Sequence, residues 1–379
     1  MIGFQMTEEQ EQIRRMAKSF AEKEIIPVAA EYDEKEQIPW GVVEKAFEAG
    51  LMNIHVPEEY GGQGLDHLTG AIVAEELAYG CLGMAGSFGA NNLALTPIML
   101  AGSDEQKERF LKPFCAKPQL AGFCLTEPNA GSDASRVATT AVREGDDYVI
   151  NGTKCFITNG GVASLYTVFC TVDRTRGLKG ITAIVVPADT PGVSAGKKEK
   201  KMGDRASHVG EVIFDNVRVP VANRLAGEGE GFRIAMKTLD ATRPGVGASA
   251  VGVARRAFEE ALKYSQQREQ FGQPIFANQA IQFMLADMAI KIEAARGLVW
   301  KSCWMLDQGL RASKEGAMAK CFAGDTAMQV AVDAVQVMGG YGYMREYPVE
   351  KLVRDAKILQ IYEGTNQIQR LVIARELVR

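Results

Sequence analysis

Apolar positions recur at helical spacing along the first part of the chain. Thr7 and Gln10 form a capping-box pattern, and the apolar positions after it lie three or four apart: Ile13, Met16, Ala17, Phe20 and Ala21. This pattern predicts a helix that ends before Pro27. The same spacing predicts further helices near residues 41–50, 68–80, 83–101 and 104–112. We therefore expect an all-helical region up to about Pro118.

The pattern changes beyond Pro118. Short β-branched and aromatic runs, separated by Gly, Asp, Asn and Pro, predict strands near 166–172, 181–186 and 212–214. The spacing is helical again near 232–242, 245–269, 278–308 and 313–338, and four long amphipathic helices are typical of a bundle. We predict an α+β fold with an all-α domain (1–118), a barrel- or sandwich-like β-sheet domain (119–229) and a four-helix bundle (230–379).

A glycine-rich segment, Gly227 to Gly231, joins the predicted β-sheet and bundle domains. Gly-x-Gly-x-Gly resembles a nucleotide-binding loop. No strand-then-helix unit with an acidic residue about 20 positions further on accompanies it. This favours a flexible junction between domains.

Composition and charge exclude several classes of function. Apolar residues make up 46% and charged residues 24% of the 379 residues, which is typical of a globular protein with a large core. The net charge of −4 gives no reason to expect a nucleic-acid partner. The polar start, Met1 to Arg14, predicts no signal peptide. No apolar run approaches the roughly 20 residues of a membrane span.

Cysteine and histidine spacing predicts neither disulfides nor a metal site. The 7 cysteines contain no Cys-x-x-Cys pair, which favours a reducing, intracellular setting. The 3 histidines have no metal-type spacing to one another or to a cysteine. We expect a cytoplasmic protein if the source is bacterial, and a mature mitochondrial-matrix protein if it is eukaryotic.

One carboxylate near the C-terminus stands out as a candidate base. Glu363 lies between Tyr362 and Gly364 in Ile-Tyr-Glu-Gly-Thr-Asn-Gln-Ile-Gln-Arg, residues 361–370. A carboxylate in dry surroundings can remove a proton from a carbon next to a carbonyl. Taken alone, the segment fits equally well a turn at Gly364 with Thr365 as the N-cap of a final helix over 366–377.

Other motifs place this segment in a wider pattern. They are Val-Pro-Glu-Glu-Tyr-Gly-Gly-Gln-Gly at 56–64, Phe-Cys-Leu-Thr-Glu-Pro-Asn-Ala-Gly-Ser-Asp at 123–133, Thr-Lys-Cys-Phe-Ile-Thr-Asn-Gly-Gly at 153–161, Arg-Glu-Gln-Phe-Gly-Gln-Pro-Ile at 268–275, and the run from Gln336-Val-Met-Gly-Gly-Tyr-Gly-Tyr to Lys351 and Asp355. Together they resemble the acyl-CoA dehydrogenase family, flavoproteins that introduce the α,β double bond into acyl-CoA thioesters. The resemblance spans essentially the whole chain.

The resemblance implies FAD as the electron acceptor and Glu363 as the base. No side chain accepts a hydride, so the reaction needs a cofactor. The thioester carbonyl would be held by the backbone N–H of the base and a flavin hydroxyl, as in an oxyanion hole. Some relatives carry the base at the position of Thr242, which cannot act as one. Further residues matched to the substrate are Ser132, Asp240, Arg243, Tyr362 and Gly364; an arginine at a helix end is a simpler explanation of Arg243.

The residues matched to FAD come from all the motifs. They are Phe123, Leu125, Thr126, Ser132, Phe156, Thr158, Arg268, Phe271, Gln279, Gln336, Gly339, Gly340, Thr365 and Gln367. Arginine binds phosphate, and paired glycines let backbone N–H groups approach it closely. Two positions depart from the family: Phe156 replaces a common Trp, and Arg136 a small residue. Without the family, Phe156 fits a core strand residue and 129–133 a polar turn.

We interpret the chain as an FAD-dependent dehydrogenase of straight-chain, short- to medium-chain acyl-CoA. Electrons would pass to an electron-transfer flavoprotein, and shared cofactor sites imply a homotetramer. An acyl-CoA oxidase is the alternative, disfavoured because such chains usually carry an extra C-terminal domain. A non-catalytic acyl-CoA-binding relative is disfavoured by Glu363, and a dehydratase with an iron–sulfur cluster by the scattered Cys and His. Acyl length depends on side chains near 82–97 whose facing the pattern does not give.

Overall fold

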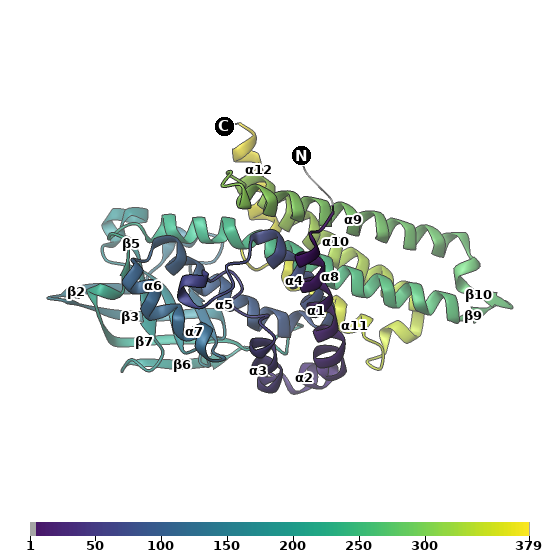
Figure 1. Cartoon of the computed structure of the whole chain (residues 1–379), viewed down its shortest axis with the longest axis horizontal. Coiled ribbons are helices and arrows are strands. Elements are labelled where there is room, and N and C mark those ends of the chain that lie inside the picture. The colour runs from purple at the N-terminus through teal and green to yellow at the C-terminus, as the bar shows by residue number, and fades with distance from the viewer. Residues whose placement is uncertain (1–4, 379) are drawn as a thin grey trace.

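The computed structural model describes residues 5–378 and begins with the predicted N-terminal helices (Figure 1). The hydroxyl of Thr7 accepts from the Gln10 N–H, and the Gln10 side chain accepts from the Thr7 N–H, which confirms the capping box. The helices of this region are α1 (Glu8–Phe20), α2 (Ala29–Lys35), α3 (Trp40–Glu48), α4 (His67–Gly80), α5 (Leu82–Ala101), α6 (Asp104–Phe110) and α7 (Lys112–Ala116). The N-terminal region is therefore all helical, as predicted.

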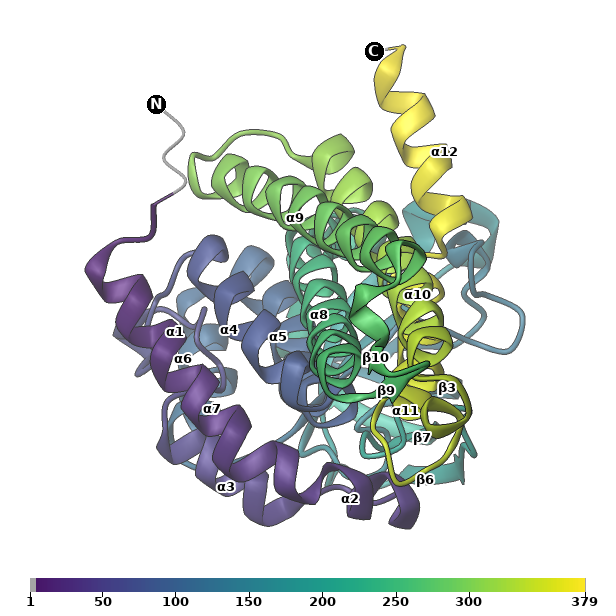
Figure 2. The ribbon, with the colours of Figure 1, turned by 90° about the vertical axis from the view of Figure 1, so that its right-hand side faces the viewer.

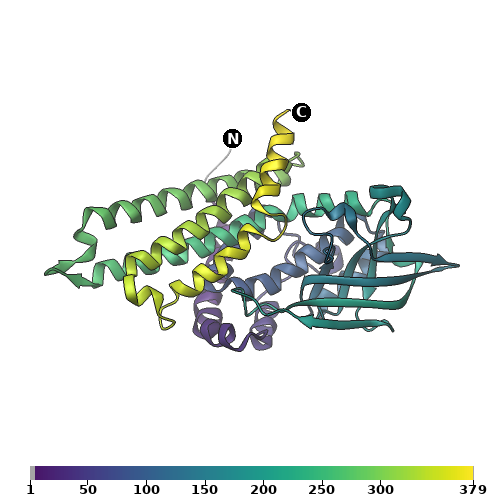
Figure 3. The same cartoon turned by 180° about the vertical axis from the view of Figure 1, so that it is seen from behind.

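A β-sheet follows and lies at one end of the elongated molecule (Figure 3). Its strands are β1 (Ala121–Cys124), β2 (Thr140–Glu144), β3 (Asp147–Thr158), β4 (Leu165–Thr171), β5 (Ile181–Pro187), β6 (Val193–Lys198), β7 (Val209–Pro220) and β8 (Arg224–Leu225). The order is β6-β7-β3-β2-β4-β5-β8, and β1 pairs in parallel with β4. The central sheet is confirmed, but it does not close on itself, so the barrel form is wrong.

The long helices of the C-terminal region follow the sheet in the chain. They are α8 (Gly231–Gln267), α9 (Gln279–Asp307) and α10 (Ser313–Met338), followed by the shorter α11 (Val349–Ala356) and α12 (Asn366–Leu377). A small hairpin of β9 (Glu269–Gln270) and β10 (Gln273–Pro274) joins α8 to α9. The helical C-terminal region is confirmed. The predicted break before 245 is wrong, because α8 continues through the buried Pro244. Packing on both sides of Pro244 outweighs the one backbone hydrogen bond that proline cannot make.

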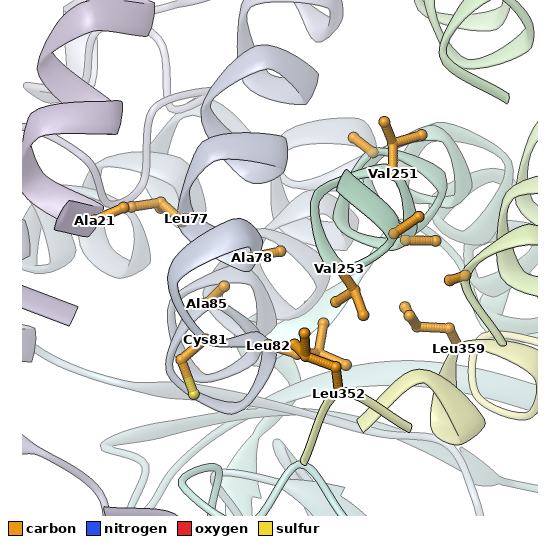
Figure 4. Close-up of a cluster of buried hydrophobic side chains, with 14 of the residues drawn as sticks. Ala21, Leu77, Ala78, Cys81, Leu82, Ala85, Val251, Val253, Leu352 and Leu359 are labelled. Atoms are coloured by element: carbon orange, nitrogen blue, oxygen red, sulfur yellow. The ribbon is translucent and has the colours of Figure 1, made fainter. Parts of the chain in front are cut away.

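The N-terminal helices pack directly onto the bundle, which fixes both around one core. Leu82 of α5, Val253 of α8 and Leu352 of α11 belong to a single buried cluster (Figure 4). A Cβ on Gly252 of α8 would lie 2.2 Å from the Glu75 carbonyl oxygen of α4, so only glycine permits this close approach. Within residues 5–378, no helix has the length and apolar character needed to span a membrane.

Candidate active site

A cavity of about 1080 Å³ opens where the N-terminal helices, the sheet and α8 meet. Residues predicted from distant segments line it together: Phe123, Leu125, Thr126, Ser132, Phe156, Thr158, Arg243, Tyr362, Glu363, Gly364 and Thr365. The loop before α12 supplies the last four of these residues. The fold therefore places the candidate base in the same cavity as the strand residues matched to the cofactor.

The loop that carries Glu363 has an unusual backbone. Glu363 has a φ of +51° and Gly364 one of +89°, and a non-glycine residue in the left-handed region is strained. Lys320 donates to the Gly364 carbonyl over 2.9 Å, and the Gln369 amide donates to the same oxygen over 2.9 Å. Thr365 caps α12 by accepting from the Ile368 N–H, as predicted. These contacts hold Glu363 in its strained conformation.

The Glu363 carboxylate has a hydroxyl as its closest partner. Thr242 of α8 donates a hydrogen bond to Glu363 Oε2 over 2.8 Å. Burial raises the pKa of Glu363, and the Thr242 hydrogen bond and the charges of Arg243 and Lys320 oppose that rise. Glu363 is consequently a stronger base than a carboxylate in water, and within residues 5–378 no cation forms an ion pair with it.

Two buried cations flank the base. Burial lowers the pKa of Lys320 to about 8. Arg243 is bound by the Asp240 carboxylate, which also accepts from Ser313 over 2.6 Å. Among the described residues, Arg243 Nε has no hydrogen-bond partner, and Arg243 lines the cavity. Asp240 itself does not line the cavity, so it holds Arg243 in place instead of facing a ligand.

The sheet forms the opposite wall of the cavity. A register shift between β3 and β7 lies at Lys154 to Ile157, and within it Phe156 takes a φ of +56° and is 64% exposed. The bulge turns the Phe156 ring out of the sheet and onto the cavity. Beneath this wall Lys154 donates to Glu127 over 2.7 Å and to the Leu125 carbonyl over 3.1 Å, which anchors the strand ends. Arg136 is exposed and does not line the cavity.

A second, smaller hollow lies at the hairpin end of the bundle. It measures about 500 Å³ and includes Arg268, Gly339 and Gly340. A Cβ on either glycine would meet no atom within 4 Å, and Gly339 has a φ of +59°. The remaining predicted residues are exposed and line neither hollow: Phe271, Gln279, Gln336 and Gln367. One chain alone therefore does not bring all the predicted cofactor residues together.

Sequence models of a known family match nearly the whole chain. The N-terminal, middle and C-terminal domains of acyl-CoA dehydrogenase match residues 7–118, 122–217 and 229–378. The chain belongs to the acyl-CoA dehydrogenase family. Members of the family are FAD-dependent, and this acyl-CoA dehydrogenase is accordingly a flavin-dependent oxidoreductase.

Individual relatives agree with this assignment over full length. The short-chain specific acyl-CoA dehydrogenase of Clostridium acetobutylicum is 46% identical over 100% of both chains. Butyryl-CoA dehydrogenase from Megasphaera elsdenii has a TM-score of 0.98 at 44% identity, covering 100% of both chains. A chain in the structure of the electron transferring flavoprotein of Acidaminococcus fermentans has a TM-score of 0.98 at 48% identity, again covering 100% of both.

The two hollows fit the parts of FAD. The main cavity offers an aromatic ring, Phe156, and the hydroxyls of Thr126 and Thr158, which suit a flat ring with polar edges. The uncovered glycines beside Arg268 suit a diphosphate, since both backbone N–H groups and guanidinium bind phosphate oxygens. These residues of the acyl-CoA dehydrogenase would hold the cofactor.

The structure also shows site residues that the sequence did not predict. Thr242 was considered only as a residue that cannot act as a base, yet its hydroxyl contacts Glu363. Lys320 and Gln369 donate to the Gly364 carbonyl; Lys320 lies in none of the motifs, and Gln369 lies in the 361–370 segment but was assigned no role. Asp204 and Gly86 line the cavity from a loop and from α5. Because Thr242, Lys320, Asp204 and Gly86 lie far from Glu363 in the chain, spacing alone carries no signal for them.

Proposed function

We propose that this acyl-CoA dehydrogenase oxidises straight-chain acyl-CoA of short to medium length to the trans-2-enoyl-CoA, with Glu363 as the base. The observation that carries the proposal is a carboxylate of raised pKa in a protein-lined cavity, held by one hydroxyl and a braced loop. The similarity to a short-chain specific relative and to butyryl-CoA dehydrogenase supports the acyl length.

The residues of the chain account for the proton transfer. Glu363 removes the α proton, and its own N–H stabilises the charge that develops on the thioester oxygen. Arg243, fixed by Asp240, places a positive charge beside the cavity, and its free Nε is available to a ligand acceptor. When bound, FAD accepts the hydride that leaves the β carbon. Ser132, an exposed residue that also lines the cavity, is the residue we assign to the CoA moiety.

An anaerobic titration tests the proposed reaction. Purified enzyme with FAD is mixed with acyl-CoAs of 4 to about 12 carbons, and flavin absorbance is followed. We expect bleaching that is strongest among the shorter chains. Enzyme that retains FAD and is bleached by none of them contradicts the proposal.

We also propose that electron-transfer flavoprotein takes up the electrons. The similarity to a chain in the electron transferring flavoprotein structure supports such a partner. In air, turnover without the carrier should be slow and should rise steeply when the carrier is added. Stoichiometric peroxide at full rate, with no stimulation by the carrier, would identify an oxidase instead.

We infer further that the active form is a homotetramer in the cytoplasm. Phe271 of the hairpin is fully exposed, and on α9 Phe283 is 61% and Ile290 66% exposed. The helix α9 lies on the outside of the bundle (Figure 2). Apolar side chains of this size favour burial against a second copy. The neighbouring Arg268 would then serve a cofactor site shared between copies.

Light scattering and flavin absorbance test the shared site. Arg268→Ala should lose FAD and loosen the assembly together, because one phosphate contact at the boundary supports both. Arg233→Ala, an exposed arginine at the other end of α8, is the control and should change neither. A monomeric wild-type enzyme with full FAD content contradicts the inference.

A further inference from the structure

The cavity extends past Glu363 into a space between α5 and α8. Three glycines line this part: Gly86 and Gly89 on α5, and Gly245 on α8. A Cβ on Gly89 or Gly245 would meet no atom within 4 Å, so the helices leave open room here. Tyr362, the neighbour of the base, also lines the cavity. Since Glu363 must reach the α carbon, this space is where the rest of an acyl group fits.

One of the carboxyl groups that line the cavity is deeply buried. Asp204, in the loop between β6 and β7, is only 6% exposed and lines the cavity. Its Oδ1 is buried and has no hydrogen-bond partner among the described residues. The same oxygen lies 3.5 Å from where a Cβ on Gly86 would be. The unpartnered oxygen therefore points toward the α5 wall of the acyl space.

The charged residues around Asp204 are committed to other partners. Lys351 pairs with Asp355 over 2.5 Å, and Arg354 pairs with Asp33 over 2.7 Å. Lys201 donates to the Ser207 carbonyl over 2.6 Å. The backbone is fixed as well, because the Asp204 N–H donates to Asp355 Oδ1 over 2.7 Å. The protein thus holds Asp204 firmly and leaves its carboxyl oxygen without a partner.

A buried polar group without a partner is costly, and such sites in proteins usually meet a ligand or a water. Burial raises the pKa of Asp204 to about 7, so both protonation states are populated near neutral pH. In either state the carboxyl can accept a hydrogen bond from a hydroxyl.

We propose that Asp204 recognises a hydroxyl group on the acyl chain of the substrate, so that the preferred acyl-CoA is a hydroxylated one. Gly86 provides the room, since any larger residue there would stand in front of Asp204. The inference rests on the proposed function, because it assumes an acyl-CoA whose α carbon meets Glu363.

Steady-state kinetics with isomeric substrates tests this recognition. The probes are hexanoyl-CoA and its 4-, 5- and 6-hydroxy derivatives, which differ only in the hydroxyl and its position. For wild-type enzyme we expect at least one hydroxy isomer to exceed hexanoyl-CoA in kcat/KM by about tenfold, the value of one net hydrogen bond. Asp204→Gly, which suits the φ of +55° at this position, should abolish that preference.

Three further variants complete the test, the last of them as a control. Asp204→Asn retains an acceptor oxygen and should keep part of the preference. Gly86→Ser places a hydroxyl in front of Asp204 and should remove the preference without changing the loop, which covers the case that Asp204→Gly does not fold. Asp33→Asn alters the same charged cluster outside the cavity and should leave the preference intact.

The outcomes separate this inference from the proposed function. Bleaching by hexanoyl-CoA with no preference for any hydroxy isomer overturns the role of Asp204, which would then hold only a water, and leaves the dehydrogenase assignment standing. A preference that survives both Asp204→Gly and Gly86→Ser overturns it as well. Failure of every acyl-CoA to bleach the flavin contradicts the proposed function itself.

Discussion

Two pairs of carboxylates, one joining α4 to the bundle and one lining the cavity, differ in their partners. On α4, Glu75 and Glu76 are 7% and 1% exposed, and both contact arginines. Arg255 and Arg296 each donate to Glu75 over 2.9 Å, and Arg255 also binds Glu76. These carboxylates join the N-terminal helices to the bundle.

Glu363 and Asp204 line the cavity, and among the described residues neither of them forms an ion pair. Glu363 accepts one hydrogen bond from a hydroxyl, and Asp204 Oδ1 accepts none within the described chain. Burial raises the pKa of both. The comparison shows that a carboxylate paired with arginines serves as a structural contact between helices. A carboxylate that accepts only from a neutral hydroxyl, or from no group, keeps a raised pKa and stays basic.

The largest effect is expected at the base. Glu363→Gln should reduce flavin reduction by several orders of magnitude, since losing a positioned base typically costs at least about 10²-fold to 10⁴-fold. FAD content and acyl-CoA binding should be kept, because the amide has the same shape. Stopped-flow absorbance measures the rate, and reduction at near wild-type speed would contradict the assignment.

The paired carboxylates should respond in the opposite way. Glu76→Ala leaves Arg255 buried with only part of its partners, and breaking a buried pair typically costs about 3–5 kcal/mol. Denaturant unfolding should show this loss of stability, while flavin reduction by the folded fraction should stay near wild type. Glu8→Ala on the exposed face of α1 is the control. If Glu76→Ala kept its stability but lost flavin reduction, Glu76 would have a catalytic role and not a structural one.

The smallest effect is expected at Thr242, whose hydroxyl donates to the Glu363 carboxylate. Catalysis needs ionised Glu363, so flavin reduction should rise with pH through a pKa above the usual carboxyl range. Thr242→Val removes a hydrogen bond that lowers this pKa, so the profile should move to higher pH. A shift of one unit makes the rate about tenfold lower on the acid side. Thr242→Ser keeps the hydroxyl and should show the wild-type pH profile. Identical pH profiles for Thr242→Val and wild type would show that the Thr242 hydroxyl does not lower the pKa of Glu363.

Local signals in the sequence explain which elements were predictable. The capping box at Thr7 and the N-cap at Thr365 depend on neighbours three residues away, and both are confirmed. α10 matches its predicted range because its apolar spacing is uninterrupted. The helix break predicted at Pro244 is wrong, because α8 continues through this residue and is stabilised there by packing against segments distant in the chain.

Site geometry was less predictable for the same physical reason. Motifs placed Glu363 and Phe156 in the cavity, but neither the strained backbone of the base nor the bulge that exposes the ring follows from local pattern. The Thr242 hydrogen bond joins residues 121 positions apart. Asp204 resembles a loop aspartate in sequence, and only the fold shows that its Oδ1 is buried with no hydrogen-bond partner among the described residues.

Exchange of the α proton tests the central claim most directly. An acyl-CoA with sulfur at the β position has an acidic α proton and no β hydrogen to lose, so it reports proton removal alone. In D₂O, wild-type enzyme should exchange this proton, as followed by NMR, with a rate that rises with pH, and Glu363→Gln should not. Exchange at the wild-type rate by Glu363→Gln would show that another group is the base.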